Sequence, residues 1–357
     1  MSKAAELAKW GEVSTNGQVS GRRNIVINGG MNVAQRATSA TGLGDDNDEN
    51  YPTVDRFEIN GNAGAGRFTM TQEAVTDLPG FPECIKLDCT TADTSIAAAE
   101  RLFIQTKIEG QDLQATGTGT ADAKPITLSF YAKASASFKF VAALLNVDND
   151  RYAGSTFDVT TSWQRFIITF PADVDDGSSP FDNDNADSLH IRFFLHAGAN
   201  YTSGTLSSTF ANAVAANTYD SNAGSFYSST DNNFFITGVQ LEVGSVATPF
   251  EHRSFGEELA LCQRYYYDPK LSSGNYWWLH PIVTDSTGSY RRGSFPLPTA
   301  MRADPTATLT GATNGTFASN MPAVEGNDHR HYIGLTGDTN GENKYSDIRS
   351  LTLDAEL

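Results

Sequence analysis

Short apolar segments with alternating polar residues run through most of this chain and end repeatedly in Gly, Asp, Asn or Ser. A period of two is typical of β-strands with one buried face, and the intervening residues are those that favour turns. The clearest segments are GRFTMTQ, ECIKLDC, RLFIQTKI, PITLSFYAKA, FKFVAALLNV, WQRFIITF, LHIRFFLHA and NFFITGVQLEVG. Their spacing predicts an all-β fold with a jelly-roll or β-sandwich domain.

The last of these segments shows the alternation most clearly. Val239, Leu241 and Val243 alternate along it with the polar residues Gln240 and Glu242. Because successive side chains of a strand point to opposite faces, the sequence predicts one buried apolar face and one exposed polar face. Two earlier segments, NIVINGG and VDRFEI, also favour β-structure.

A different pattern opens the chain. Leu7 and Trp10, with neighbouring alanines, form a short apolar stripe, and the polar linker GEVSTNGQVSG follows it. A helix this short is not stable alone, so we expect residues 1–21 to dock on a sister chain or a larger assembly.

A second helix is predicted where the long β region ends. Ser254 and Glu257 form a capping-box pattern, which predicts a helix near residues 257–264 with Leu259 and Cys262 facing inward. The chain therefore divides into four expected parts. These are a docking helix with its linker (1–21), a jelly-roll β-sandwich (22–250), a hinge with a short helix (251–264) and a smaller β-sandwich domain (265–357).

Charge limits the partners of such a chain. Acidic residues outnumber basic ones, 42 to 25, and give a formal net charge of −17. Such a protein is repelled by nucleic acid and by anionic membranes, so neither nucleic-acid binding nor membrane insertion is expected. The opening residues are charged and lack the apolar segment of a secretory signal, so we expect no signal peptide. Cys84, Cys89 and Cys262 are then expected to be buried free thiols.

Acidic residues gather between residues 172 and 189, where Lys and Arg are absent. Asp182, Asp184 and Asp187 stand there among asparagines, and oxygen ligands on a loop are what Ca²⁺ prefers. The EF-hand order of ligands is missing. A solvated surface loop and a Ca²⁺ site at these three aspartates are both open interpretations.

Aromatic residues form a cluster after the predicted second helix. Its members are Tyr265, Tyr266, Tyr267, Tyr276, Trp277 and Trp278. Flat rings stack on sugars, but aromatic side chains also dominate cores and subunit interfaces. Because neighbours on a strand face opposite sides, we expect half of the cluster in a core and the rest at an interface or a glycan-binding surface.

Histidines and nucleophiles give weaker signals. His329 and His331 would share one face of a strand, as in a transition-metal pair, but a third ligand is not evident. An exposed pair is the alternative. G-x-S-x-G and H-E-x-x-H motifs are absent, and the glycines of GNAGAG have the wrong order for dinucleotide binding. The sequence therefore predicts a protein that is not an enzyme, although distant acids can converge in a fold.

Two parts of the chain resemble known proteins. One consists of NIVINGGMNVAQRATSATGL and YPTVDRFEI, at residues 24–43 and 51–59, and the other is ITGVQLEVGSVATPFEHRSFGEELALCQRYYYD, at residues 236–268. Both are similar to segments of tail-fibre-like virion proteins of marine bacteriophages and cyanophages. The resemblance extends over about residues 22–268.

The resemblance implies a virion structural protein, a homotrimeric tail fibre with a carbohydrate-binding-module-like jelly roll. Leu7 and Trp10 would then dock on tail or baseplate proteins, and the β domains would bind a host-surface glycan. The protein would be made in the host cytoplasm. The resemblance supplies no catalytic residues. Two alternatives stay open: a capsid fibre or decoration protein without a receptor role, and a polysaccharide depolymerase tailspike.

Overall fold

A computed structural model describes residues 22–45, 48–62, 64–174 and 180–269, and then 277–278, 283–284, 290–310, 323–325, 332–338, 347–348 and 350–357. The chain divides into two compact units, Met1–Phe255 with Leu357, and Gly256–Glu356. No helix among these described residues is long and apolar enough to cross a membrane.

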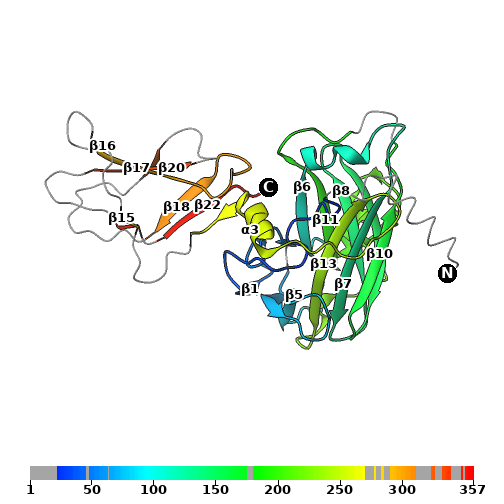
Figure 1. The fold of residues 1–357 in the computed structure, drawn as a ribbon. Coiled ribbons are helices and arrows are strands. Elements are labelled where there is room, and N and C mark those ends of the chain that lie inside the picture. The colour runs from blue at the N-terminus through cyan, green and yellow to red at the C-terminus, as the bar shows by residue number, and fades with distance from the viewer. Residues whose placement is uncertain are drawn as a thin grey trace. The chain divides into compact units, whose positions relative to one another are not determined.

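The first unit is a sandwich of two antiparallel sheets (Figure 1). The six-stranded sheet has the order β1 (Ser39–Leu43), β4 (Arg67–Ala74), β5 (Glu83–Thr91), β13 (Asn233–Val243), β7 (Ile126–Ala134) and β10 (Gln164–Phe170). The seven-stranded sheet has the order β12 (Ala211–Asn212), β9 (Arg151–Val159), β8 (Phe138–Asn146), β11 (Asp187–Ala197), β6 (Arg101–Glu109), β3 (Glu58–Asn62) and β2 (Asp48–Asn50).

The path of the chain is that of a jelly roll. After β5 it passes to the other sheet for β6, returns for β7, crosses again for β8 and β9, and continues to alternate through β10, β11 and β13. Most neighbouring strands, such as β5 and β13 or β6 and β11, therefore come from distant parts of the sequence. The predicted all-β, jelly-roll class is confirmed.

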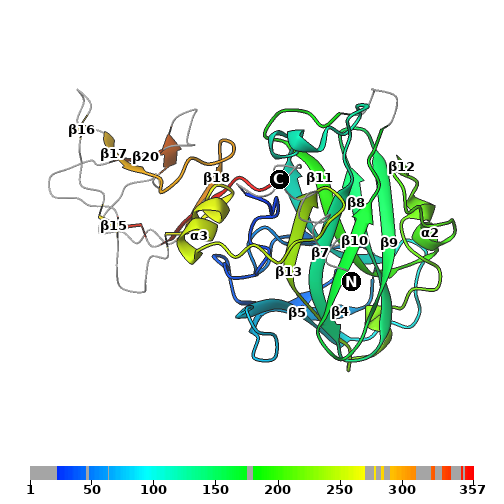
Figure 2. The same ribbon diagram turned by 45° about the vertical axis from the view of Figure 1, so that its right-hand side comes forward.

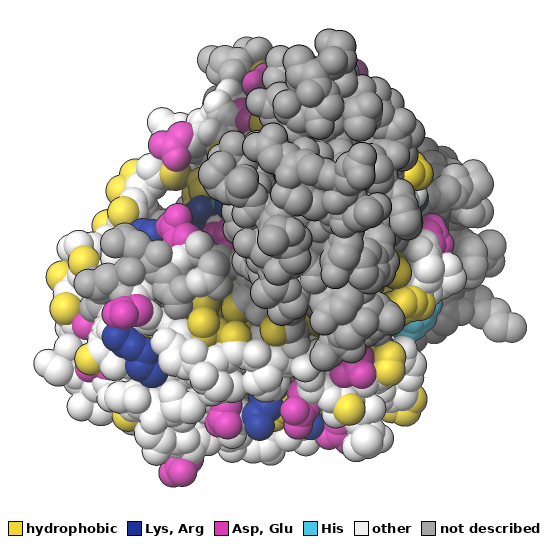
Figure 3. Space-filling model, turned by 90° about the vertical axis from the view of Figure 1, so that its left-hand side faces the viewer, with side chains coloured by type: hydrophobic (Ala, Val, Ile, Leu, Met, Phe, Trp, Pro, Cys, Tyr) yellow, Lys and Arg dark blue, Asp and Glu magenta, His cyan; other side chains and the backbone are white. Residues whose placement is uncertain are grey.

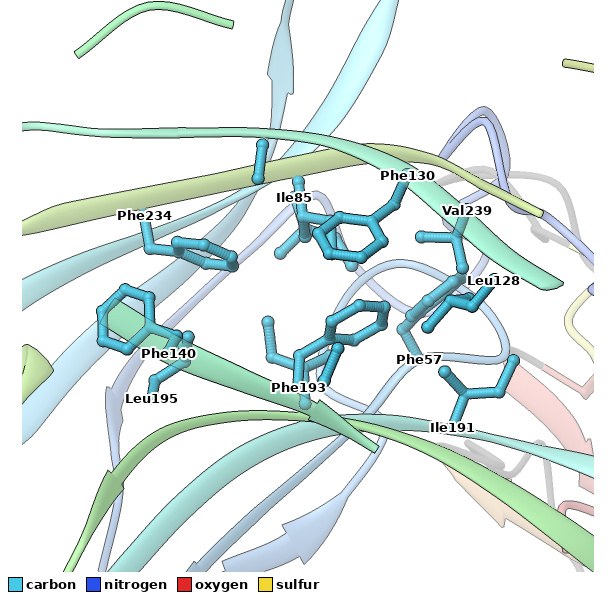
Figure 4. Packing of buried hydrophobic residues seen from close by; sticks show 14 of the residues in the cluster. Phe57, Ile85, Leu128, Phe130, Phe140, Ile191, Phe193, Leu195, Phe234 and Val239 are labelled. Carbon is cyan, nitrogen blue, oxygen red and sulfur yellow. The ribbon is translucent and has the colours of Figure 1, made fainter. Parts of the chain in front are cut away.

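Between the sheets lies a core rich in phenylalanine. Phe130 of β7 lies at its centre, with its ring 4.9 Å from that of Phe193, 5.1 Å from that of Phe157 and 5.3 Å from that of Phe166. Figure 4 shows rings from both layers, including those of Phe130 and Phe193, pointing into the space between them. Such pairs add about 0.5–1.5 kcal/mol each to the free energy of unfolding, beyond the burial of their area.

Alternation predicted most of these strands well. On β5, Ile85, Leu87 and Cys89 pack into the core, while Cys84 lies on the opposite face, buried and unpaired as expected. Three segments differ. VDRFEI begins as a turn, with Arg56 at a positive φ angle of 70°, and only Glu58 and Ile59 of it lie in β3. NIVINGG is a turn rather than a strand, because Asn28 and Met31 adopt positive φ angles of 59° and 60°. The strand β9 was missed because RYAGSTFDV has small residues at its centre.

The predicted wet face of β13 is wrong. Gln240 and Glu242 are both fully buried, because the chain returns over them after the strand. Glu242 accepts hydrogen bonds from the amide of Gln240 (2.8 Å) and from the backbone N–H of Thr248 (3.0 Å). The Glu251 N–H donates to Gln240 Oε1 at 2.8 Å.

Asn24 extends this arrangement to the start of the described chain. Its Oδ1 accepts from the N–H groups of Val26 (3.0 Å) and Leu241 (3.1 Å), and its amide donates to the carbonyl of Val239 (3.1 Å). We call Asn24, Gln240, Glu242, Thr248 and Glu251 the polar clasp. The two segments that carry the family resemblance thus lie against each other and close the outer face of β13.

The described part of the second unit consists of small antiparallel sheets and one helix. The predicted helix is α3 (Phe255–Gln263), which begins two residues earlier than expected. Its buried residues are Glu258 and Cys262, so Cys262 is confirmed as inward-facing and Leu259 is only partly buried. The described strands are β14 (Tyr266–Tyr267), β22 (Ser350–Asp354) and β18 (Thr306–Thr310) in one sheet, β15 (Trp277–Trp278) and β21 (Asp347–Ile348) in another, and β16 (Val283–Thr284), β17 (Tyr290–Pro296), β20 (Tyr332–Asp338) and β19 (Ala323–Glu325) in a third.

On the face shown in Figure 3, acidic side chains are scattered and do not form one block. They alternate there with a few Lys and Arg side chains and with uncharged groups. A net charge of −17 spread in this way disfavours non-specific contact with anions. Positive groups that gather in one place are therefore informative.

Candidate functional site

A pocket of about 300 Å³ lies on the outer face of the seven-stranded sheet. It is lined by Glu49, Asn60, Arg101, Phe103, Leu145, Asp150, Tyr152, Arg192, Phe194, Tyr201, Ala213, Ala215 and Thr218. Pockets that bind small molecules or saccharide units begin at about this size. All of its lining residues belong to the first unit.

The period of two explains why these side chains meet. On β6, Leu102 and Ile104 face the core, so Arg101 and Phe103 face outward. On β11, Ile191 and Phe193 face the core, so Arg192 faces outward. The two strands pair antiparallel, with Arg192 opposite Gln105 and Phe194 opposite Phe103. The sheet therefore sets both arginines and their aromatic neighbours side by side.

The segment of residues 198–224, which we call the wall segment, covers part of the same face. It contains α2 (Ala199–Thr202), β12 and the 3₁₀ turn η3 (Ala215–Asn217), and Figure 2 shows α2 and β12 beside β9. Tyr152 of β9 donates its hydroxyl proton to the carbonyl of Thr218 (2.6 Å), and β12 pairs with β9. The wall segment bounds the pocket on the β9 side.

Arg101 is held on three sides. Its Nε donates to Asn60 Oδ1 (3.0 Å), and its Nη1 donates to the Tyr201 hydroxyl (2.9 Å). Its Nη2 lies 3.7 Å from Glu49 Oε1, which also accepts from the Asn60 amide at 2.6 Å. These contacts join β2, β3, β6 and the wall segment. They fix the Arg101 guanidinium in place before any ligand arrives.

Arg192 lies over an aromatic ring. Its guanidinium carbon is 4.8 Å from the centre of the Phe103 ring, a cation–π distance. Phe103 and Phe194 are both buried beneath it, with ring centres 4.6 Å apart. The rings therefore serve as a floor under the arginine, and the polar groups above them face the pocket. Burial lowers the pKa of Arg192 to about 10, with the Arg101 charge acting in the same direction.

His190 lies between Arg192 and the carboxylate of Asp187. Its Nε2 lies 2.7 Å from Asp187 Oδ2, and its Nδ1 lies 3.2 Å from Arg192 Nη2. Because both Asp187 and Arg192 have fixed roles as acceptor and donor, the neutral ring carries its proton on Nε2. Burial lowers the pKa of His190, and the hydrogen bond from His190 lowers the pKa of Asp187 to about 2.

A second polar cluster is enclosed by the fold. Buried His196 lies 2.8 Å from Ser225 Oγ and 3.2 Å from Glu100 Oε2. Burial lowers the pKa of His196. Ser225 Oγ also accepts from the Tyr227 N–H and caps the 3₁₀ turn η4 (Phe226–Ser228). The order of groups matches a nucleophile, base and acid, but Ser225 is committed to this cap, so the cluster stabilises the turn.

The predicted calcium ligands have other contacts here. Asp187 contacts His190, and Asp184 Oδ1 accepts from the Ala186 N–H at 2.9 Å within its own loop. Asp182 is exposed. In the part of the chain that the structure describes, no three His, Cys, Asp or Glu side chains gather as a metal site would need. The Ca²⁺ site stays a prediction.

The predicted aromatic cluster is split between described and undescribed residues. Tyr265 is buried, and its carbonyl accepts from the Ala355 N–H at 2.7 Å, so it belongs to the core of the second unit. Tyr267 is partly buried, and burial raises its pKa. Trp277 and Trp278 form β15, but their side chains lie outside the described residues. Other predicted site residues lie there too, namely Tyr276, His329, His331, Leu7 and Trp10.

Sequence reasoning missed the pocket residues. The pattern Arg-x-Phe-x-Gln on RLFIQTKI and the pattern His-x-Arg-x-Phe on LHIRFFLHA were visible as outward faces. What was not visible is that β6 and β11 pair, because Gln105 and Arg192 are 87 positions apart. An arginine on the polar face of each of two strands was the available signal.

Comparison with known proteins gives weak likenesses. No protein-family model and no curated protein matches this chain. Among solved structures, it is similar to the enzymatically active domain of tailspike protein 4 of bacteriophage CBA120, with 10% identity and a TM-score of 0.31 over 62% of this chain. The chain spans 21% of the length of that tailspike.

Two carbohydrate-binding modules are also similar. TmCBM61 in complex with β-1,4-galactotriose has 8% identity and a TM-score of 0.30, over 62% of this chain and 99% of the module. The family 11 module from Clostridium thermocellum, in complex with a β-1,3-1,4-mixed-linked tetrasaccharide, has 11% identity and a TM-score of 0.28, over 59% of this chain and 99% of the module.

Proposed function

We propose that this protein is a structural, saccharide-binding protein of a bacteriophage particle, with its binding site in the pocket on the seven-stranded sheet. The particle assignment derives from the sequence segments at residues 24–59 and 236–268, which resemble tail-fibre-like virion proteins. The binding assignment derives from the pocket. In this proposal the protein holds a host-surface glycan and does not cleave it.

The observation that carries the binding proposal is the polar lining of a preformed pocket. Glu49, Asn60, Arg101 and Tyr201 form one connected set of hydrogen-bond donors and acceptors at its edge. Sugars present many hydroxyl groups in fixed directions, and a rigid set of polar side chains recognises them without an ordering cost. Because the aromatic rings are buried under arginine, recognition here depends on hydrogen bonds rather than on ring stacking.

Multivalency makes such a site useful on a particle. A single pocket of this size binds weakly, but linked copies bind through their high effective concentration. A homotrimer anchored to tail or baseplate proteins through its N-terminal residues would present several pockets to one cell surface. The proposal therefore requires weak binding by the isolated protein and strong binding by the particle.

Binding is tested by titrating saccharides into the purified full-length protein in a calorimeter, after a glycan array has selected them. The Arg101→Gln variant should weaken binding at least tenfold, because it removes the donor to Asn60 and Tyr201. Lys124→Gln is a charge-matched control outside the pocket and should leave binding unchanged. Absence of binding to every saccharide on the array contradicts the proposal.

Location and catalysis need separate measurements. Reconstruction of the whole particle should find the protein on the tail, whereas density only on the capsid would favour the decoration-protein alternative. Long incubation with a bound polysaccharide should release no shorter products. Release of oligosaccharides would identify a depolymerase instead.

A further inference from the structure

Arg192 is partly buried in the pocket, and its guanidinium contacts with described residues are all to uncharged groups. Its Nε donates to Gln105 Oε1 at 2.9 Å, and its Nη2 donates to His190 Nδ1 at 3.2 Å. Both partners are neutral acceptors. Among the described residues no carboxylate forms an ion pair with Arg192, and Glu58 and Glu49 act on it only from a distance. The Nη1 group is left without a hydrogen bond to any described residue.

Most acids around Arg192 are engaged elsewhere, and Asp150, the remaining acid of the pocket lining, forms no ion pair with Arg192 among the described residues. Glu58 accepts from the Gln105 amide (2.8 Å) and forms an ion pair with Lys107 (2.7 Å). Glu49 faces Arg101 and Asn60. Asp187 is separated from Arg192 by the imidazole of His190. Among the described residues, Arg192 therefore has no acid at ion-pair distance to balance its charge.

We infer that the pocket binds an anionic saccharide, with a carboxylate or sulfate ester group of the sugar on Arg192. This inference rests on the proposed function. The acidic group accepts from Nη1 and from the remaining N–H of Nη2, the bidentate arrangement that guanidinium groups make with flat or tetrahedral oxyanions. Arg101, Asn60 and Tyr201 then contact neighbouring hydroxyl groups of the same ligand.

A neutral saccharide is disfavoured for a physical reason. It would displace water from the guanidinium and return no negative charge, so that an enclosed cation would be left without a partner. The low pKa of Arg192 reflects the same enclosure. Because the rest of the protein is strongly acidic, non-specific attraction of polyanions cannot substitute for the local contact, and binding should require Arg192 itself.

The test uses an array and calorimetry with matched pairs of saccharides. The pairs are oligogalacturonate with its methyl ester, sialylated with desialylated glycans, and sulfated with desulfated galactan oligosaccharides. At least one acidic member should bind ten or more times more tightly than its neutral partner. The pair that shows the preference distinguishes a carboxylate ligand from a sulfate ligand.

Variants assign the preference to one side chain. Arg192→Met keeps the apolar stem over Phe103 and should abolish the preference for the acidic member. Arg192→Lys should keep part of it, because the charge remains but the fork is lost. Lys124→Gln should keep all of it. Thermal unfolding of each variant confirms that it is folded.

Three outcomes are decisive. Equal binding of acidic and neutral members overturns the anionic inference and leaves saccharide binding in place. A preference that survives in Arg192→Met overturns the assignment to Arg192. Absence of binding to every saccharide, acidic or neutral, overturns the proposed function and this inference together.

Discussion

Two polar strand faces of the β-sandwich differ in whether their side chains find partners within the chain. On β13, Gln240 and Glu242 are sealed under residues 248–251, and each of their polar groups meets a partner from the chain itself. On β6 and β11, Arg101 and Arg192 face a pocket, and Arg192 keeps donors without partners among the described residues. Polar groups that are satisfied internally specify the fold, whereas enclosed polar groups that are left over indicate a ligand.

The largest expected effect comes from opening the sealed face. Asn24→Ala removes the acceptor of two buried N–H groups and the donor to the Val239 carbonyl. Unpaired buried groups cost about 1–3 kcal/mol each, so we expect the three to lower the free energy of unfolding by at least about 3 kcal/mol, measured by urea denaturation. The control Asn183→Ala lies on an exposed loop and should change stability by less than about 0.5 kcal/mol. Equal small losses in both variants would contradict the role of the clasp.

An intermediate effect is expected from pH. Burial lowers the pKa values of His190 and His196 below the ordinary value of 6.5, so the unfolded chain binds protons first as the pH falls. Their contribution is therefore complete above pH 6.5 and is lost below it. The urea midpoint should be lower at pH 5.5 than at pH 7.5. A further loss follows as the pH falls below 3.8, because the pKa of Asp187 is held at about 2.

His196→Gln sharpens this prediction, because it removes one of the two titrating groups. It should reduce the difference between the two midpoints. His252→Gln is the control, because His252 is exposed and contacts Phe81 and Phe250 rather than either buried histidine. A midpoint that rises on acidification would show that the sign is wrong.

The smallest expected effect lies at the open face. Arg192→Met loses two hydrogen bonds but also removes a cation that is enclosed without an acid partner. These terms oppose each other, so the free energy of unfolding should change by less than about 1 kcal/mol in urea denaturation. A loss as large as that of Asn24→Ala would mean that Arg192 supports the fold rather than a ligand.

The sequence predicted the strands where the alternation of polar and apolar residues was strong. It failed to predict burial where a later segment folds back over a strand. RLFIQTKI and LHIRFFLHA have regular patterns, and they form β6 and β11 almost as expected. Gln240 and Glu242 were assigned to an exposed face because nothing in a local pattern reveals that residues 248–251 fold back over it. NIVINGG failed for another reason, since Asn28 Oδ1 accepts from the Val33 N–H and its amide donates to the Asp55 carbonyl, which favours a turn.

The candidate site shows the same limit more strongly. Each arginine was visible in the sequence on a polar strand face. That Arg101 and Arg192 lie near each other depends on how the chain crosses between the sheets. The buried state of Phe103 and Phe194 depends on the wall segment and on the arginines above them. Residues with a functional side chain, such as Asp182 or Tyr265, could therefore be proposed from the sequence. The residues that contact them in the fold could not be predicted.

The wall segment is a single uninterrupted stretch between two strands of the scaffold, and it forms one side of the pocket while the sheet forms its floor. Insertions, deletions or exchanges within it alter the reach of the cavity without disturbing Phe130 or the polar clasp. Ligand choice and scaffold stability can therefore evolve separately. Substitutions confined to the wall segment could adapt the pocket to a changed host surface.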